Sequence, residues 1–276
     1  MQKPFFSIVV VSLNPGERLR STLDSIQKQT FTDYEVILKD GGSKDGSLQR
    51  LVDCGYFENK KQIKIIEKKD KSIYDGMNQA VSEVNGRYVQ FLNCGDYFYS
   101  DTVLAEVAKY IAEDGKQCSL KIYYGNQYNQ VQDTIIYSSP KINDFTCYRN
   151  VPCHQVCFYD CRLFENRAYD LQYKVRADYE HFLYSIYEEK AEGVSMPIII
   201  ASYEGGGFSE TKENRKKSAK EHAVITKKYL GVAKSFKYRL IMWITLAPIR
   251  TRIAENPALS GMYNGVKTGI YKLLKR

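Results

Sequence analysis

The chain has 276 residues, of which 43% are hydrophobic, so it can bury one sizeable core and is slightly longer than one average domain. Its net charge of +8 is uneven, because residues 211–276 hold 16 basic and 3 acidic side chains and leave the first 210 residues at a net charge of −5. An odd count of seven cysteines and an N-terminus unlike a signal peptide argue against a secreted, disulfide-bonded protein, and we expect a reducing, cytoplasmic setting.

The first hundred or so residues alternate between predicted strands and helices. Residues 7–13 (SIVVVSL) are a β-branched run typical of a strand buried on both faces of a parallel sheet, and residues 14–16 (NPG) end it. A helix at 18–29 and a strand at 34–38 follow, and then a helix from 48, a strand at 63–66, a helix at 74–83 and a strand at 88–92. This order predicts an α/β fold with a Rossmann-like, mostly parallel central sheet flanked by helices.

The pattern loosens after about residue 115, where we expect strands at 121–124 and 156–159 and a helix at 178–190. We therefore predict one α/β domain over residues 1–210, with halves at about 1–115 and 116–210, and a basic, partly apolar helical extension at 211–276. Ligands of open α/β sheets bind at the carboxyl ends of the strands, which is where Asn14, Asp40 and residues 93–96 fall.

Residues 38–47 (LKDGGSKDGS) carry Asp40 from a predicted strand into a glycine-rich turn. Two adjacent glycines let a backbone approach a ligand closely, and a carboxylate there can accept from a base imide or a ribose hydroxyl. An ordinary β-turn with Asp before Gly explains this segment equally well.

Residues 70–78 (DKSIYDGMN) place Lys71, Asp75 and Asn78 at the start of a predicted helix. A helix N-terminus has free amide donors and a positive field, so this segment could hold a diphosphate, although an ordinary solvated cap would explain it alone. Residues 89–98 (VQFLNCGDYF) form a buried strand that ends in Asn93 and Asp96, where a carboxylate is well placed for a divalent cation carrying phosphate.

Several motifs in one fixed order are far more specific than any one of them. The order SIVVVSLN, STLDSIQKQTF, DGGSKDGS, SIYDGMNQAV and FLNCGDYF, over roughly the first 100 residues, resembles glycosyltransferase family two, whose members transfer sugars on a GT-A fold. The resemblance implies an inverting enzyme that moves a sugar from a nucleotide-sugar donor, UDP-linked in our prediction, to a saccharide or lipid-linked saccharide acceptor. It also implies that residues 1–115 bind the donor and residues 116–210 the acceptor.

By this resemblance, Asp40 contacts the base and Asp96 holds a divalent metal, Mn²⁺ or Mg²⁺. We assign the donor to a set of loop and strand-end residues: Asn14, Asp40, Gly41, Lys71, Asp75, Asn78 and Asn93. The sequence departs from the family's usual Asp-x-Asp metal motif, because Asn93 and Gly95 stand where acids are common and the carboxylate follows at Asp96.

Residues 152–159 (PCHQVCFY) and 176–182 (RADYEHF) resemble the family's His-Gln strand and its catalytic-acid segment. Inversion requires a carboxylate that takes the proton from the acceptor hydroxyl, and Asp178 is our choice, with Glu180 as the runner-up. Without the family pattern, the simpler interpretation of Asp178 is a helix cap. We place His154 and Gln155 near the acceptor or the diphosphate.

Cys153, His154, Cys157 and Cys161 raise the alternative of a zinc site. Their Cys-x3-Cys-x3-Cys spacing lacks the tight Cys-x2-Cys pairs of structural zinc sites, and the residues between them look like a core strand. Buried free thiols are the favoured interpretation.

The basic extension contains an apolar stretch at residues 240–249, whose ten residues are too few for a spanning helix, which needs roughly 20. Lys237, Arg239, Arg250 and Arg252 flank it, and Trp243 lies within it. Two interpretations are equally weighted: it lies on an anionic membrane surface, which would make the protein peripheral on the inner face, or it packs on the domain.

Three other functional classes remain as alternatives. Loss of the acids at positions 93 and 95 favours a non-catalytic nucleotide-sugar or polysaccharide binder on the same fold. A dinucleotide-dependent dehydrogenase is disfavoured, because no Gly-x-Gly-x-x-Gly follows the first strand. Nucleic-acid binding through the extension is weaker still, and we expect no nucleic-acid partner. The sequence leaves the oligomeric state, the donor sugar and the linkage open.

Overall fold

The structure is a computed structural model that describes residues 3–58, 60, 62–115, 119–205 and 211–245. A nine-stranded sheet runs through the described part in the order β3-β2-β1-β4-β8-β6-β9-β5, with β7 paired to β6. The strands are β1 (Phe6–Ser12), β2 (Tyr34–Asp40), β3 (Ile63–Glu67), β4 (Tyr88–Phe91), β5 (Tyr97–Phe98), β6 (Lys121–Asn129), β7 (Thr134–Ile136), β8 (Cys157–Asp160) and β9 (Glu192–Tyr203).

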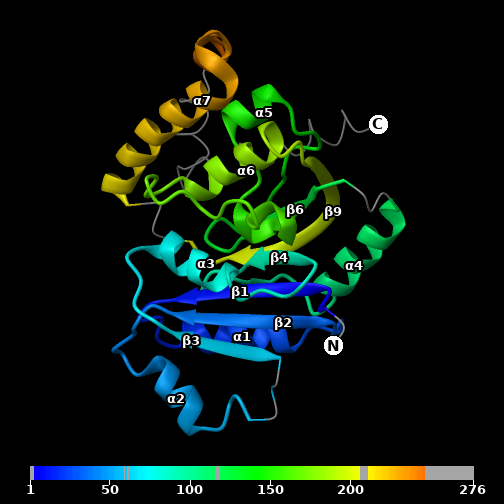
Figure 1. The fold of residues 1–276 in the computed structure, drawn as a ribbon, viewed down its shortest axis with the longest axis vertical. Helices are drawn as coiled ribbons and strands as arrows, with labels where there is room; N and C mark the ends of the chain where they lie inside the picture. The colour runs from blue at the N-terminus through cyan, green and yellow to red at the C-terminus, as the bar shows by residue number, and fades with distance from the viewer. Residues whose placement is uncertain (1–2, 59, 61, 116–118, 206–210, 246–276) are drawn as a thin grey trace.

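The helices alternate with the strands in the first half and gather in the second. They are α1 (Arg18–Gln27), α2 (Ser47–Asp53), α3 (Ile73–Val81), α4 (Val103–Asp114), α5 (Asp144–Arg149), α6 (Ala177–Tyr187) and α7 (Lys212–Ile244), with short 3-10 turns η1 (His154–Val156) and η2 (Cys161–Phe164). In Figure 1 the blue strands β1 to β3 lie in the lower part of the molecule, and α5, α6 and α7 lie above them.

Strand β1 is buried along its whole length and separates two hydrophobic cores. Because successive side chains of a strand point to opposite faces, Phe6, Ile8 and Val10 join the core under α1, α2 and α4, while Val9 and Val11 join the core under α3 and α6. Helices therefore cover both faces of the sheet, as the near-continuous apolar run predicts.

The strand direction changes in the middle of the sheet. Strands β3, β2, β1 and β4 are mutually parallel, whereas β8 runs antiparallel to β4. The first residues of β8 therefore lie at the edge where β1, β2 and β4 end. This places η1, just before β8, beside residues 93–96, just after β4.

The predicted α/β class with a largely parallel sheet and helices on both faces is confirmed, and a helix covers residues 212–244 of the predicted extension. Three differences stand out. His154 and Gln155 belong to η1, not to the His-Gln strand that the resemblance implied, and the strand predicted at 156–159 begins at Cys157. Strand β9 went unpredicted because Pro197 directly precedes its apolar run at 198–200, and a proline within an apolar run argues against a strand. Helix α4 went unpredicted although its Val103, Val107 and Ile111 recur at helical spacing.

Helix α7 begins on the surface of α5 and α6 and bends at Gly231, whose φ of 79° and ψ of 165° are not helical. Its first half buries Ile225 and Leu230 against the domain. Within the part of the chain that the structure describes, no helix combines the length and apolarity needed to cross a membrane. The residues after 245, including Arg250 and Arg252 of the predicted basic flank, lie outside the described range.

Candidate active site

Two adjoining cavities lie at the edge of the sheet where β1, β2 and β4 end. The large cavity has a volume of about 680 Å³ and is lined by Asn14, Arg18, residues 70–73, residues 93, 94 and 96, Lys174 and residues 203–205, among others. The small cavity measures about 250 Å³ and is lined by residues that include Tyr74, Met77, Gln127, His154, Gln155 and Asp178. Ile73, Asn93 and Tyr203 line both cavities, so the two share a wall.

Charges of both signs line the large cavity. Two of its acids are already paired, because Asp70 receives the buried Lys39 ammonium at 3.0 Å and Glu204 receives the Arg18 guanidinium at 3.0 Å. Among the described residues, the Lys71 ammonium forms no ion pair with an acid. Lys174 likewise forms no ion pair among the described residues, and these two ammonium groups favour an anionic ligand.

Asp40 holds the turn that follows β2. Its Oδ2 accepts from the backbone N–H groups of Gly42 and Ser43, at 2.9 and 2.7 Å, and its Oδ1 accepts from the Ser43 hydroxyl. The side chain is 3% exposed and is not part of either cavity's lining. The structure thus places Asp40 as the anchor of the turn beside the large cavity. Two lining residues connect it to that cavity: Ser12, whose hydroxyl donates to Asp40 Oδ1 at 3.2 Å, and Asn14, which is bonded to Ser43 and Lys44.

Three further predicted donor residues serve the local structure. Asp75 forms the reciprocal half of a helix cap, accepting from the Lys71 N–H at 2.8 Å while Ser72 Oγ accepts from the Asp75 N–H. The Asn78 side chain clamps Tyr169, donating to its carbonyl and accepting from its N–H. At Gly41, a Cβ would lie 2.6 Å from the Asp70 carboxylate, so packing requires glycine there.

Asp96 is a buried carboxylate in the wall of the large cavity, with 4% of the residue exposed. Burial raises its pKa above the ordinary value, opposed by the Gln155 amide, which donates to Oδ2 at 3.0 Å, and by the Glu204 N–H, which donates to Oδ1 at 3.2 Å. Each oxygen keeps a second acceptor position.

These residues fit a cation that shares its ligands with phosphate. Asp96 is the lining acid that forms no ion pair among the described residues, since Glu204 and Asp70 are paired with Arg18 and Lys39. The described residues form no group of three or more His, Cys, Asp or Glu side chains able to hold a metal ion. A divalent cation at Asp96 would therefore need phosphate oxygens and water as its other ligands, which is how Mg²⁺ is commonly held.

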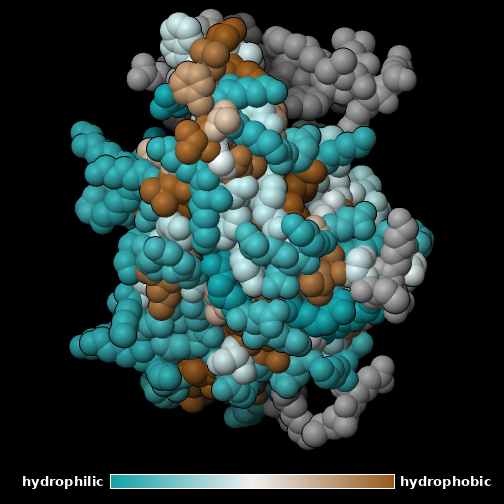
Figure 2. Space-filling view, turned by 45° about the horizontal axis from the view of Figure 1, so that its top comes forward, coloured by the Kyte–Doolittle hydropathy of each residue, from teal (hydrophilic) through white to brown (hydrophobic). Residues whose placement is uncertain are grey.

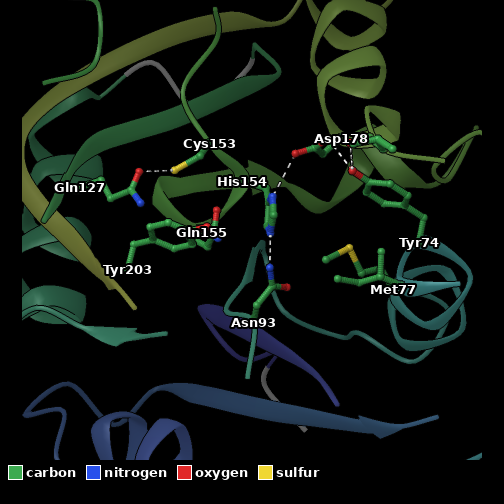
Figure 3. A pocket seen from close by; sticks show the side chains of 11 residues that line it. Tyr74, Met77, Asn93, Gln127, Cys153, His154, Gln155, Asp178 and Tyr203 are labelled. Atoms are coloured by element: carbon green, nitrogen blue, oxygen red, sulfur yellow. Dashed lines mark hydrogen bonds and ion pairs between the residues drawn. The ribbon is translucent and has the colours of Figure 1, made fainter. Parts of the chain in front are cut away.

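A continuous chain of hydrogen bonds crosses the small cavity, as Figure 3 shows. Asn93 Nδ2 lies 3.0 Å from His154 Nε2, His154 Nδ1 lies 3.0 Å from Asp178 Oδ2, and the Tyr74 hydroxyl lies 2.8 Å from Asp178 Oδ1. The Tyr74 hydroxyl lies equally close to the Val175 carbonyl, at 2.8 Å, and its single proton can serve only one of the two.

The hydrogen-bond partners fix the form of His154. An ionised carboxylate only accepts, so Nδ1 carries a proton, and Nε2 then accepts from the Asn93 amide. With its nitrogen turned to His154, Asn93 leaves its Oδ1 buried without a partner, and Oε1 of Gln155 is in the same state. Two orphaned acceptors at the small cavity favour a ligand rich in hydroxyl donors.

Asp178 is held ionised. Its side chain is 23% exposed, and partial burial alone would raise its pKa. The hydrogen bonds from His154 Nδ1 and from the Tyr74 hydroxyl outweigh burial and bring the pKa of Asp178 below the ordinary value. A carboxylate ionised at neutral pH, in a cavity large enough for a ligand, can accept a proton from a bound hydroxyl.

Glu180 lies elsewhere. Its fully buried carboxylate accepts from Arg167 at 2.8 and 3.1 Å and from Lys228 at 2.8 Å, and it is absent from the lining of both cavities. It cannot act at the small cavity from this position, so the runner-up assignment is not supported by the geometry. Its partners tie α6 to α7 instead.

The cysteines near η1 behave as buried thiols. Cys153 lines the small cavity and donates to Gln127, while Cys157 donates to the Cys153 carbonyl. Burial raises the pKa of Cys153 to about 12, which keeps the thiol protonated and a poor metal ligand. The imidazole of His154 is already engaged by Asn93 and Asp178.

Sequence reasoning missed several lining residues. Arg18 follows the NPGE turn directly, and Asp70 opens the DKSIYDG motif, so both stood next to recognised segments. Lys174, Tyr203 and Glu204 carried no signal, because they come from the second half of the chain and reach the large cavity only through the folding of β9 and α6.

Comparison with known proteins finds similarity in both sequence and fold. The family model described as "Glycosyl transferase family 2" matches residues 7–171. A PGL/p-HBAD biosynthesis glycosyltransferase of Mycobacterium bovis is 32% identical over 214 residues, covering 76% of this chain and 81% of that protein.

Two solved structures share the fold. S. aureus TarS in complex with UDP-GlcNAc superposes with a TM-score of 0.63 at 18% identity, over 80% of this chain and 66% of that one, so this chain spans somewhat less than two thirds of it. The mannosyltransferase PcManGT from Pyrobaculum calidifontis, in complex with GDP-Man and Mn²⁺, gives a TM-score of 0.65 at 13% identity, over 100% of this chain and 83% of that one.

Proposed function

The chain belongs to glycosyltransferase family 2, and from this we propose that it is an inverting, metal-assisted enzyme that transfers a sugar from a UDP-linked donor to a saccharide or lipid-linked saccharide. One observation carries the proposal. The ionised carboxylate of Asp178 lies in a small cavity that adjoins a larger cavity, whose lining includes Lys71 and Lys174. A base in one cavity and a leaving-group site in the adjoining cavity suit a single displacement.

In that displacement, the acceptor hydroxyl oxygen attacks the anomeric carbon from the small cavity. Asp178 takes the hydroxyl proton, the new C–O bond forms, and the bond to the diphosphate breaks with its electron pair leaving on the phosphate oxygen. Attack and departure on opposite sides invert the anomeric configuration. Asn93 and Tyr203 stand at the shared wall, where the transferred sugar would lie.

The large cavity would hold the nucleoside diphosphate. Lys71 and Lys174 would compensate its charge, and Asn14 lies at the turn that Asp40 anchors. Asp96 would hold a divalent cation, Mn²⁺ or Mg²⁺, whose chemistry is to stabilise negative charge on the departing diphosphate. The Mn²⁺ of the PcManGT complex supports the choice of a divalent cation.

A donor screen tests the proposal. We would measure hydrolysis and transfer with UDP-hexoses, UDP-N-acetylhexosamines and GDP-mannose, with Mn²⁺, Mg²⁺ or EDTA. We expect a UDP-sugar to be turned over only with metal, and Asp96→Ala to lose the signal. Calorimetric binding of UDP without turnover, equal in wild type and Asp178→Asn, would instead identify a non-catalytic binder. Full activity of Asp96→Ala would remove the metal assignment.

We also propose that the second half of α7 lies on an anionic membrane surface, making the enzyme peripheral on the cytoplasmic face. Val232, Phe236, Leu240, Trp243 and Ile244 recur at helical spacing and are between 45% and 72% exposed. Lys237 and Arg239 accompany them, giving the two attractive contributions that stable anchoring needs. Figure 2 shows brown, apolar side chains gathered at the top of the molecule.

Flotation with vesicles tests this contact. We expect the protein to float with phosphatidylglycerol-containing vesicles more than with pure phosphatidylcholine, and the Phe236→Ser, Trp243→Ser double variant to stay in solution. Val224→Ser, which replaces a 57% exposed residue on the first half of α7, serves as the matched control. Equal flotation of the double variant and wild type would refute the membrane contact.

A further inference from the structure

Residues 174–176 connect the two cavities to the helix that bears Asp178. Lys174 lines the large cavity, Val175 lines the small one, and Arg176 is the cap residue of α6. A shift of this short segment would therefore displace a cation on the donor side and the base on the acceptor side together.

A single carboxylate of α7 holds the backbone of this segment. Glu221 Oε1 accepts from the Lys174 N–H at 2.8 Å, and its Oε2 accepts from the Val175 N–H at 3.1 Å and the Arg176 N–H at 2.9 Å. Three successive amides turned toward one point form an anion-binding concavity, and a carboxylate there makes charge-assisted hydrogen bonds.

Other contacts hold the same segment on both sides. From α7, Ser218 accepts from Arg176 Nε through its hydroxyl at 2.7 Å and its carbonyl at 3.2 Å. From α3, the Tyr74 hydroxyl lies within hydrogen-bonding distance of both Val175 and Asp178. The segment is thus fixed between α7 and α3, and only the α7 side contributes a charge.

We infer that Glu221 is a positioning residue for sugar transfer, which sets Lys174 and Asp178 relative to each other by fixing the backbone between them. This inference rests on the function proposed above and extends it to a helix outside the matched residues 7–171 of the family model. The role belongs to one acid in a helix whose other charges are mostly basic.

Substitution of Glu221 tests the inference in the full chain. Glu221→Ala removes all three acceptor contacts, and Glu221→Gln keeps one acceptor oxygen without the charge. Glu213→Gln is the matched control, because Glu213 lies in the same helix, is 77% exposed and pairs only with Lys217 among the described residues. We would count competent sites by the stoichiometry of UDP binding and express kcat per competent site.

We expect kcat per site to fall about tenfold to a hundredfold in Glu221→Ala, less in Glu221→Gln, and not at all in Glu213→Gln. Formate should restore part of the loss in Glu221→Ala by filling the three-amide site, whereas chloride at equal ionic strength should not. If Glu221 had a merely structural role, Glu221→Ala would have fewer UDP-binding sites, but its kcat per site would equal that of wild type and formate would not change it.

Amide hydrogen exchange separates this inference from the proposed function. We expect the amides of residues 174–176 to exchange faster in Glu221→Ala than in wild type or Glu213→Gln. Unchanged exchange overturns the inference even if the enzyme is active. If these amides exchange faster in Glu221→Ala but the wild-type protein transfers no sugar, the anchoring role of Glu221 stands and the proposed function is refuted.

Discussion

Replacing Asp178 by Asn separates chemistry from folding in this site. Asn has the same shape but cannot take up a proton, so the displacement would lose its base. Positioned general bases contribute about 10²- to 10⁴-fold, which corresponds to about 3–5 kcal/mol in the activation barrier. We expect kcat to fall within that range.

The hydrogen bonds around position 178 can be rearranged at little cost. An Asn Oδ1 can accept from His154 Nδ1, where the carboxylate does now, at 3.0 Å. Its Nδ2 can donate to the Tyr74 oxygen, because the Tyr74 proton has a second acceptor in the Val175 carbonyl at 2.8 Å. No polar group is orphaned, so we expect the free energy of unfolding to change by no more than about 1 kcal/mol.

The assay measures kcat from UDP release, the Kd for UDP by calorimetry, and unfolding in urea. We expect the Kd to stay within about threefold of wild type, since Asp178 is absent from the large-cavity lining. A variant that folds, binds UDP and keeps a kcat within about threefold of wild type would refute the assignment of Asp178 as base.

Three further predictions concern buried groups. Glu180→Gln should lower the free energy of unfolding by about 1–3 kcal/mol, because the fully buried carboxylate loses its charge opposite the partly exposed Arg167 and Lys228; an unchanged urea midpoint would contradict this. Burial lowers the pKa of His181 to about 4, so the unfolded state binds more protons between pH 6.5 and 4, and stability should fall by about 3 kcal/mol as pH drops through that window. Above about pH 5, where carboxylates stay ionised in both states, His181→Phe should flatten most of this slope, the remainder coming from His222, whose pKa burial also lowers; an equally steep slope there would argue against it. Gly95→Ala should weaken UDP binding in calorimetry, because φ is +104° and a Cβ would lie 2.7 Å from the Glu204 carboxylate, and unaltered binding would show that this turn can adjust.

Alternating apolar runs and turn residues predicted the first half of the sheet, because parallel strands buried on both faces leave a strong local signal. The same runs place Asp96 and Asn93 after β4, at a strand end that the structure puts in a cavity wall. The second half follows weaker signals. Strand β9 is held mainly by its long pairing with β6, which no local pattern reveals.

The direction of a side chain was harder to predict than its position in the chain. Asp178 and Glu180 both lie in the first turn of α6, yet one faces the small cavity and the other faces Arg167 and Lys228. Which of the two acids faces the small cavity depends on α7, which begins more than 30 residues later in the chain and packs on α6. Asp40 and Asp75 likewise have the right chemistry at the right place, but their own turn and helix cap use their oxygens.

The short pairing between β4 and β8 fixes the spacing across the active site of this enzyme. Its register, Tyr88 opposite Asp160 and Val89 opposite Tyr159, sets how far residues 93–96 stand from residues 154–155, although roughly 60 positions of chain separate them. A slip by one residue would turn each side chain of the shifted strand to the opposite face. Insertions in the loops between β4 and β8 can therefore leave this spacing unchanged, whereas a single insertion inside either of these two strands would shift Asn93 and Asp96 relative to His154 and Gln155.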